Sequence, residues 1–178
     1  ITVTYPDGST AHHHAGNTVS ESGSTDTFTV VLNAQPASNV TIELTSGDTG
    51  EATISPTLLT FTSSNWNITQ EVVVTGINDD IIDGNQTTLI DLSVVGAPPG
   101  SDWEWLEQLD AIVTTVDDDS AGVTVVATDG STVVSESGST DTFTVVLNTQ
   151  PGTDVNINVT SGDTGEATVL PTLLTFTN

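Results

Sequence analysis

Carboxylates dominate the chemistry that this sequence could do. The 178 residues include 24 aspartates and glutamates but no lysine or arginine, so the formal net charge is -24. Some of these acids are adjacent, as in the pair Asp79 and Asp80 and in the run from Asp117 to Asp119. Carboxylate oxygens on flexible loops are ligands that Ca²⁺ prefers, and one ion takes about six to eight oxygens. The acids therefore indicate a calcium site, with solvated turn residues that form Asx turns as the alternative.

The uncompensated charge also limits the partners of this chain. Repulsion between like charges destabilises a compact state, so we expect divalent cations, high salt or a basic partner to offset it. Binding to nucleic-acid phosphates needs lysine and arginine, which excludes nucleic acid as a partner and disfavours an anionic membrane surface. No apolar run reaches the roughly 18 residues of a membrane-spanning helix, so we expect no membrane insertion.

The three histidines, His12 to His14, are adjacent in the sequence. Imidazole is a common ligand of zinc and copper. Adjacent residues of a strand point to opposite faces, however, so three in a row cannot easily chelate one ion. A loop insertion or a local contact is our interpretation, with a metal site as the alternative.

Catalysis finds little support in the residue types. The chain has no cysteine nucleophile and no lysine, and its histidines have no catalytic context. Neighbouring turn acids such as Asp79 and Asp80 rarely stand at the separation that glycoside hydrolysis requires. We therefore expect a protein that is not an enzyme.

Trp103 and Trp105 flank Glu104 in the segment PPGSDWEWLEQLD. Strand alternation would place both indoles on one side, where they could form a platform for a glycan or a subunit contact. The alternative is that both indoles cover one end of the core. Trp66, in SSNWNITQ, is interpreted as a packing residue.

Four sequons of the form Asn-x-Ser/Thr are candidate sites of N-glycosylation. In a chain this rich in asparagine and threonine, several such sequons arise by chance. The four asparagines are Asn39, Asn67, Asn85 and Asn158.

An internal repeat organises the elements that must position these residues. The fifteen residues Val19–Asn33 recur letter for letter as Val134–Asn148, an offset of 115 residues. This offset is the size of a domain and exceeds the length of a solenoid repeat. We expect a complete domain over residues 1–121 and the first half of a second domain over 122–178, which lacks a counterpart of residues 66–119.

The hydrophobic pattern predicts an all-β fold. Phe28, Val30 and Leu32 alternate with more polar residues, so one face of that strand packs and the other is wetter. Short strands separated by turn residues at domain-sized repetition indicate tandem immunoglobulin-like β-sandwiches, the second incomplete. No segment shows a helical period, except for a possible single turn in 103–110. The predicted strands are 1–4, 25–32, 39–45, 58–62, 71–76, 87–95 and 111–116.

Three motifs, namely VSESG, SGDTGEATISPTLLTFTSSNWNITQEVVVTGINDDIIDG and TTVDDDSAG, occur in this order. Together they resemble the Calx-beta superfamily, in the divergent form found as tandem repeats of large bacterial surface proteins. The resemblance covers nearly all of the first copy and half of the second. It implies a sandwich that binds Ca²⁺ through carboxylates clustered at one end, near the junction with the next domain.

The resemblance also implies which acids would hold the calcium. Asn78 stands where the family often has an acid, and IIDGNQ replaces a glutamate-rich continuation, so fewer ions are implied. In the second copy, Glu136 and Asp163 would be the equivalent residues. The implied ligands of the first copy are Glu21, Asp48 (or Glu51), Asp79, Asp83, Asp117, Asp118 and Asp119.

From these features we expect a non-catalytic structural repeat of an extracellular fibre, surface layer or adhesin stalk, stiffened by calcium at domain junctions. The alternative is a carbohydrate-binding adhesive module that uses Trp103 and Trp105. The chain opens inside a strand-like segment, so we expect part of a longer polypeptide, extracellular or at the cell surface. The strands missing from the second copy would come from neighbouring repeats or from identical subunits, including by strand donation.

Overall fold

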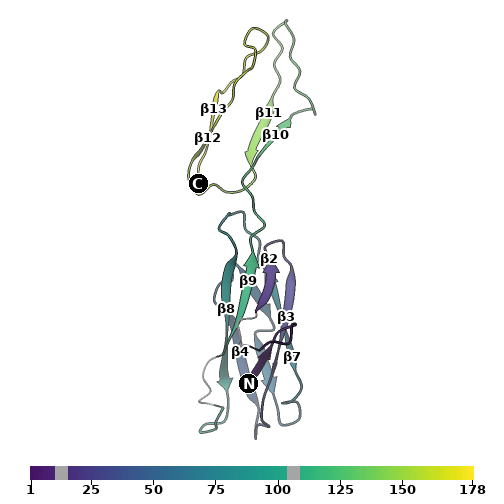
Figure 1. The fold of residues 1–178 in the computed structure, drawn as a ribbon, viewed down its shortest axis with the longest axis vertical. Coiled ribbons are helices and arrows are strands. Elements are labelled where there is room, and N and C mark those ends of the chain that lie inside the picture. Colours follow the sequence, from purple (N-terminus) through teal and green to yellow (C-terminus); the bar gives the residue numbers. More distant parts are fainter. Residues whose placement is uncertain (11–15, 104–108) are drawn as a thin grey trace. The chain divides into compact units, whose positions relative to one another are not determined.

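The computed structural model describes residues 1–10, 16–103 and 109–178. It contains two compact units, the first formed by residues 1–79 and 83–118 and the second by residues 80–82 and 119–178. All the regular elements in the described ranges are β-strands (Figure 1). Within the same ranges there is no helical segment with the length and apolar character that crossing a bilayer requires.

The first unit is a sandwich of two sheets. Neighbouring strands run antiparallel, except that β2 and β9 are parallel. The predicted all-β, immunoglobulin-like fold is confirmed. In spatial order, one sheet holds β1 (Thr2–Thr4), β3 (Thr25–Val31), β7 (Gln70–Gly76) and β5 (Ala52–Ser55), and the other holds β2 (Asn17–Ser20), β9 (Leu109–Val116), β8 (Gln86–Gly96), β4 (Val40–Ser46) and β6 (Leu58–Phe61).

Alternating apolar residues from both sheets form the core of this unit. Phe28, Val30 and Leu32 are each at most 2% exposed, as the alternation predicted. Their partners across the sandwich include Ile42 and Phe61, which are fully buried. Burial of apolar surface on this scale is the main stabilising contribution to such a fold.

All seven predicted strands are present, with ends that differ by at most two residues. Two further strands, β2 and β5, were not predicted. Each is four residues long and depends on a partner distant in sequence, because β2 pairs with β9 and β5 pairs with β7. The suggested helical turn falls largely on residues 104–108, outside the described residues, and Leu109 begins β9.

The second unit repeats part of this architecture. Its strands are β10 (Val123–Ala127), β11 (Phe143–Leu147), β12 (Val155–Asn158) and β13 (Leu173–Phe176), which form two separate pairs. The pair Val125 and Val145 matches Val3 and Val30 of the first copy, and Ile157 and Leu174 match Ile42 and Leu59. None of the described side chains in this unit is fully buried.

The duplicated sequence provides a test of this difference in packing. Phe28 and Phe143 occupy the same place in identical segments, but Phe28 is 1% exposed and Phe143 is only half-buried. We expect Phe28→Ala to lower the free energy of unfolding of the first unit by about 3 to 5 kcal/mol. Phe143→Ala should lower the free energy of unfolding of the second unit far less. Urea unfolding followed by amide hydrogen exchange, read separately for the residues of each unit, measures both effects; equal losses would contradict the packing described.

Candidate metal centre

Strand directions bring four loops to the same end of the first unit. Because β2 and β9 are parallel, with Ser20 opposite Val116, the residues that follow both strands emerge together. The start of β8 lies beside the end of β9, and the start of β5 pairs with the end of β7 at Gly76. The acids after β2, before β5, between β7 and β8, and after β9 are therefore neighbours in space.

Glu21 is the most deeply buried acid at this end. The residue is 1% exposed, and its amide donates a hydrogen bond to the Val116 carbonyl oxygen at 3.2 Å. Neither carboxylate oxygen of Glu21 has a hydrogen-bond partner of normal geometry. Burying a charge without compensation is costly, so this position needs a counter-charge or a proton.

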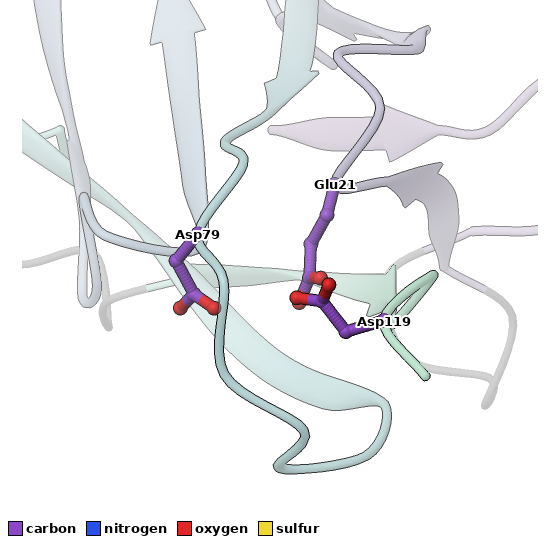
Figure 2. A group of neighbouring side chains, drawn as sticks. All are labelled: Glu21, Asp79 and Asp119. Atoms are coloured by element: carbon purple, nitrogen blue, oxygen red, sulfur yellow. The ribbon is translucent and has the colours of Figure 1, made fainter. Parts of the chain in front are cut away.

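Three carboxylates converge closely enough to share one cation. One oxygen each from Glu21, Asp79 and Asp119 lie within 4.8 Å of one another. Figure 2 shows the side chains of Glu21 and Asp119 facing each other, with Asp79 nearby. These residues come from segments separated by tens of residues, so no local sequence motif contains the group.

Further acids raise the negative potential around this group. Burial raises the pKa of Glu21, and the charges of Asp117, Asp79 and Glu51 raise it further. A hydrogen bond from the Asp118 backbone partly offsets this rise in the pKa of Glu21.

Glu51 has a similar environment. Burial makes the largest contribution to the raised pKa of Glu51, and the charges of four neighbouring acids raise it further, namely Asp83, Asp79, Asp48 and Asp117. Its Oε2 atom is buried and has no hydrogen-bond partner. We name Glu21, Glu51, Asp79, Asp117 and Asp119 the carboxylate cluster.

The loop between β7 and β8 is tied to the end of β9. The Gly84 amide donates to Asp117 Oδ2 at 2.7 Å, and the Asp117 amide donates to Asn85 Oδ1 at 3.2 Å. Gly84 has a φ of +76°, a conformation that favours glycine. These contacts hold Asp117 beside the loop that carries Asp79 and Asp83.

The remaining implied ligands lie at the edge of the cluster. Asp48 is exposed, and its Oδ1 accepts a hydrogen bond from the Gly50 amide at 2.9 Å, as in an Asx turn. Asp83 and Asp118 are exposed as well. Of the two acids in SGDTGE, Glu51 is the more buried, because its neighbour Ala52 begins β5.

The chemistry of the cluster fits a hard divalent cation. Glu21 and Glu51 present buried carboxylate oxygens without hydrogen-bond partners, and the chain contains no lysine or arginine that could pair with them. Oxygen-only donors on irregular loops match the preference of Ca²⁺. The fit rests on the orphaned buried oxygens, because exposed acids occur widely without ions.

The equivalent residues of the second copy lie in a different environment. Glu136 and Asp163, which correspond to Glu21 and Asp48, are both exposed. Asp163 Oδ1 still accepts from the Gly165 amide at 2.9 Å. The local turn is thus the same in both copies, whereas the buried carboxylate occurs in the first copy.

The structure describes some of the other candidate residues and not others. Four of them lie outside the described residues, namely His12, His13, His14 and Trp105. Trp66 and Trp103 are partly buried and pack against the core. The sequon asparagines are all exposed, and they are Asn39, Asn67, Asn85 and Asn158.

Comparison with known proteins gives similarity in structure only. No protein-family model and no curated protein matches the chain. The apo-form Calx CBD1 domain is 18% identical over 66% of this chain and 96% of its own, with a TM-score of 0.43. The calcium binding domain CBD12 of CALX1.1 is 16% identical over 72% of this chain and 49% of its own, with a TM-score of 0.41. SSP-19, an MSP-domain protein like family member in Caenorhabditis elegans, is 15% identical over 57% of this chain and 94% of its own, with a TM-score of 0.42.

Similar structures thus include Calx-beta domains, as the sequence motifs suggested, but only at low identity. No matched sequence supports the narrower resemblance to repeats of bacterial surface proteins. Similarity at this level implies nothing about a ligand.

The buried carboxylate predicts an unusual pH dependence in the absence of divalent cations. Since the folded pKa of Glu21 lies above its ordinary value, Glu21 stabilises the fold below that ordinary value. This contribution is lost as the pH rises through the folded pKa. With a chelator present, Glu21→Gln should therefore be more stable than the parent at neutral pH and should depend less on pH.

Glu136→Gln is the matched control, because Glu136 has identical sequence neighbours and is exposed. Urea unfolding from about pH 4 to about pH 8 measures each variant. A Glu21→Gln variant that follows the parent at every pH would contradict the uncompensated burial of this carboxylate.

Proposed function

We propose that the end of the first unit, with the adjoining residue Asp119, is a calcium-binding site, and that the chain is a non-catalytic structural repeat of an extracellular or cell-surface protein. The observation that carries this proposal is the buried Glu21 carboxylate without a hydrogen-bond partner of normal geometry, grouped with Asp79 and Asp119. The net charge of -24 adds to it, because the chain has no lysine or arginine that could compensate the cluster.

Calcium suits these donors better than magnesium. Mg²⁺ demands nearly ideal octahedral geometry and keeps several waters, whereas Ca²⁺ accepts irregular sets of oxygens from flexible loops. Glu21, Asp79 and Asp119 would hold the ion, and Glu51 and Asp117 would complete its surroundings. When bound, the ion supplies the positive charge that these carboxylates lack.

Ion binding would act on stability, with no chemical step. A ligand that binds the folded state alone stabilises it according to its concentration and affinity. The ion would join the end of β2 to the loop after β7 and to the residues that follow β9. Ordering this last segment would stiffen the connection that leads to β10, which suits a stalk or fibre.

An extracellular location agrees with the composition. The chain has no cysteine or methionine, so little in it can be oxidised. Its four sequon asparagines are exposed, as glycosylation requires.

The primary test is a calcium titration of the whole chain. At a free Ca²⁺ concentration about 100 times the dissociation constant, one site should add about 2.7 kcal/mol to the free energy of unfolding. Calorimetric melts with Ca²⁺, with chelator, and with Mg²⁺ at matched ionic strength separate specific binding from screening. Superimposable melts in Ca²⁺ and in chelator would reject the proposal.

Paired variants locate the site. Glu21→Gln should weaken calcium binding at least about tenfold, since it removes the charge of a buried ligand, a loss of more than about 1.4 kcal/mol, and Glu136→Gln should leave calcium binding unchanged. Asp119→Asn should weaken binding more than Asp7→Asn, because Asp119 belongs to the converging group whereas Asp7 is exposed and its Oδ1 accepts from the Ser9 amide within a local turn. Equal effects within either pair, measured by isothermal titration calorimetry, would mean that the charge acts diffusely.

A further inference from the structure

The parallel pairing of β2 with β9 has a mechanical consequence. The register places Asn17, which begins β2, opposite Val113, and Ser20, which ends β2, opposite Val116 at the end of β9. In Figure 1 the arrows of both strands accordingly point the same way. The polypeptide therefore enters β2 at one end of this pair and leaves β9 at the other end.

Tension along the polypeptide would load this pair in shear. It would pull β2 backward from its start and β9 forward from its end, so that both forces act along the strands. The hydrogen bonds of a parallel pair are evenly spaced along the strands, so under shear they carry the load together. If the two strands were instead pulled apart from a common end, the residue pairs would separate one at a time.

The ladder between the two strands continues past the end of β2. The Glu21 amide donates a hydrogen bond to the Val116 carbonyl oxygen at 3.2 Å. By the alternation of a strand, the amides of Val19 and Asn17 face β9 as well. Ahead of β2, the Tyr5 hydroxyl oxygen accepts a hydrogen bond from the Ile112 amide at 2.9 Å, which connects the segment after β1 to β9.

The other edge of β2 is held by β3. The Thr18 amide donates to Asp26 Oδ2 at 3.2 Å. Asn17 is fully buried, and its Nδ2 donates to the Thr27 carbonyl oxygen at 2.8 Å. Sliding β2 along β9 would therefore break contacts on both of its edges.

Close backbone packing also encloses β2. A Cβ atom at Gly16 would lie 2.6 Å from the Ile112 carbonyl oxygen, and a Cβ atom at Gly76 would lie 2.2 Å from the Ser20 carbonyl oxygen. Only glycine permits such approaches, at the start of β2 and at its end. The strand is thus held along its whole length.

We infer that the pairing of β2 with β9 is a mechanical clamp, which resists tension along the polypeptide and sets the force at which the first unit unfolds. This inference rests on the proposed role as a structural repeat, since a stalk or fibre is stretched in use, but it requires no bound ion. Forced unfolding is governed by the rate of unfolding, and contacts that are still intact at the barrier do not change that rate. The force should therefore depend on the clamp and little on the rest of the core.

The direction of pulling tests the clamp in an optical trap. The chain has no cysteine, so introduced thiols define where the handles attach. A cysteine added before Ile1, combined with Ser120→Cys, loads the clamp in shear. Ser22→Cys with Ser120→Cys loads it from a common end, because these exposed residues follow β2 and β9 and adjoin Glu21 and Asp119, whose carboxylate oxygens converge. In chelator and at one loading rate, we expect a higher mean unfolding force in the first direction.

Two matched variants test whether the clamp alone sets the force. Val19→Ala and Val40→Ala make the same change at buried positions, the first in β2 and the second in β4, which pairs with β6 and β8. Both should lower the free energy of unfolding measured in urea. Only Val19→Ala should lower the mean unfolding force in the shear direction, because the contacts of Val40 are intact when the clamp breaks.

Two outcomes would overturn the inference. One is the same unfolding force in both pulling directions, which needs no substitution in the core. The other is a loss of force from Val40→Ala as large as the loss from Val19→Ala. Because the pulling is done in chelator, a failed calcium titration leaves the expected difference between directions unchanged, and equal forces leave the calcium proposal unchanged.

Discussion

The burial of carboxylates in a chain without lysine or arginine is the constraint on which the rest of this molecule depends. Glu21 and Glu51 are drawn inward because they adjoin β2 and β5, whose neighbouring residues Val19 and Ala52 belong to the core. Burial of apolar side chains at these strands stabilises the fold, and burial of the adjacent carboxylates destabilises it. A cation or a proton relieves that penalty, so the packing of the core and the occupancy of the cluster are linked.

The duplicated segments separate the effect of local sequence on a residue from the effect of its tertiary environment. Glu21 and Glu136 share identical neighbours along the chain, as do Phe28 and Phe143, but one member of each pair is buried and the other is not. Strand pairing in β10 with β11 and in β12 with β13 keeps the register of the first copy. Local turns and adjacent pairs therefore form independently of the complete sandwich, whereas burial requires β7, β8 and β9.

The two units differ in how completely their side chains are buried. The first unit has a buried core and places carboxylates beside it without lysine or arginine, whereas no described side chain of the second unit is fully buried. A divalent cation bound at the carboxylate cluster would supply the counter-charge that the first unit lacks.

The sequence by itself determined the strands with clear alternation, the repeat and its offset, and the set of acids, because these depend on residue type and short-range spacing. Strands β2 and β5 escaped prediction, since four residues carry little periodicity and their pairing partners are distant in the chain. Only the tertiary structure decided that Glu21, Asp79 and Asp119 meet, and that Glu51 lies deeper than Asp48. The physical reason is that the parallel alignment of β2 with β9, together with the pairing of β5 with β7, brings distant loops to one end of the sandwich.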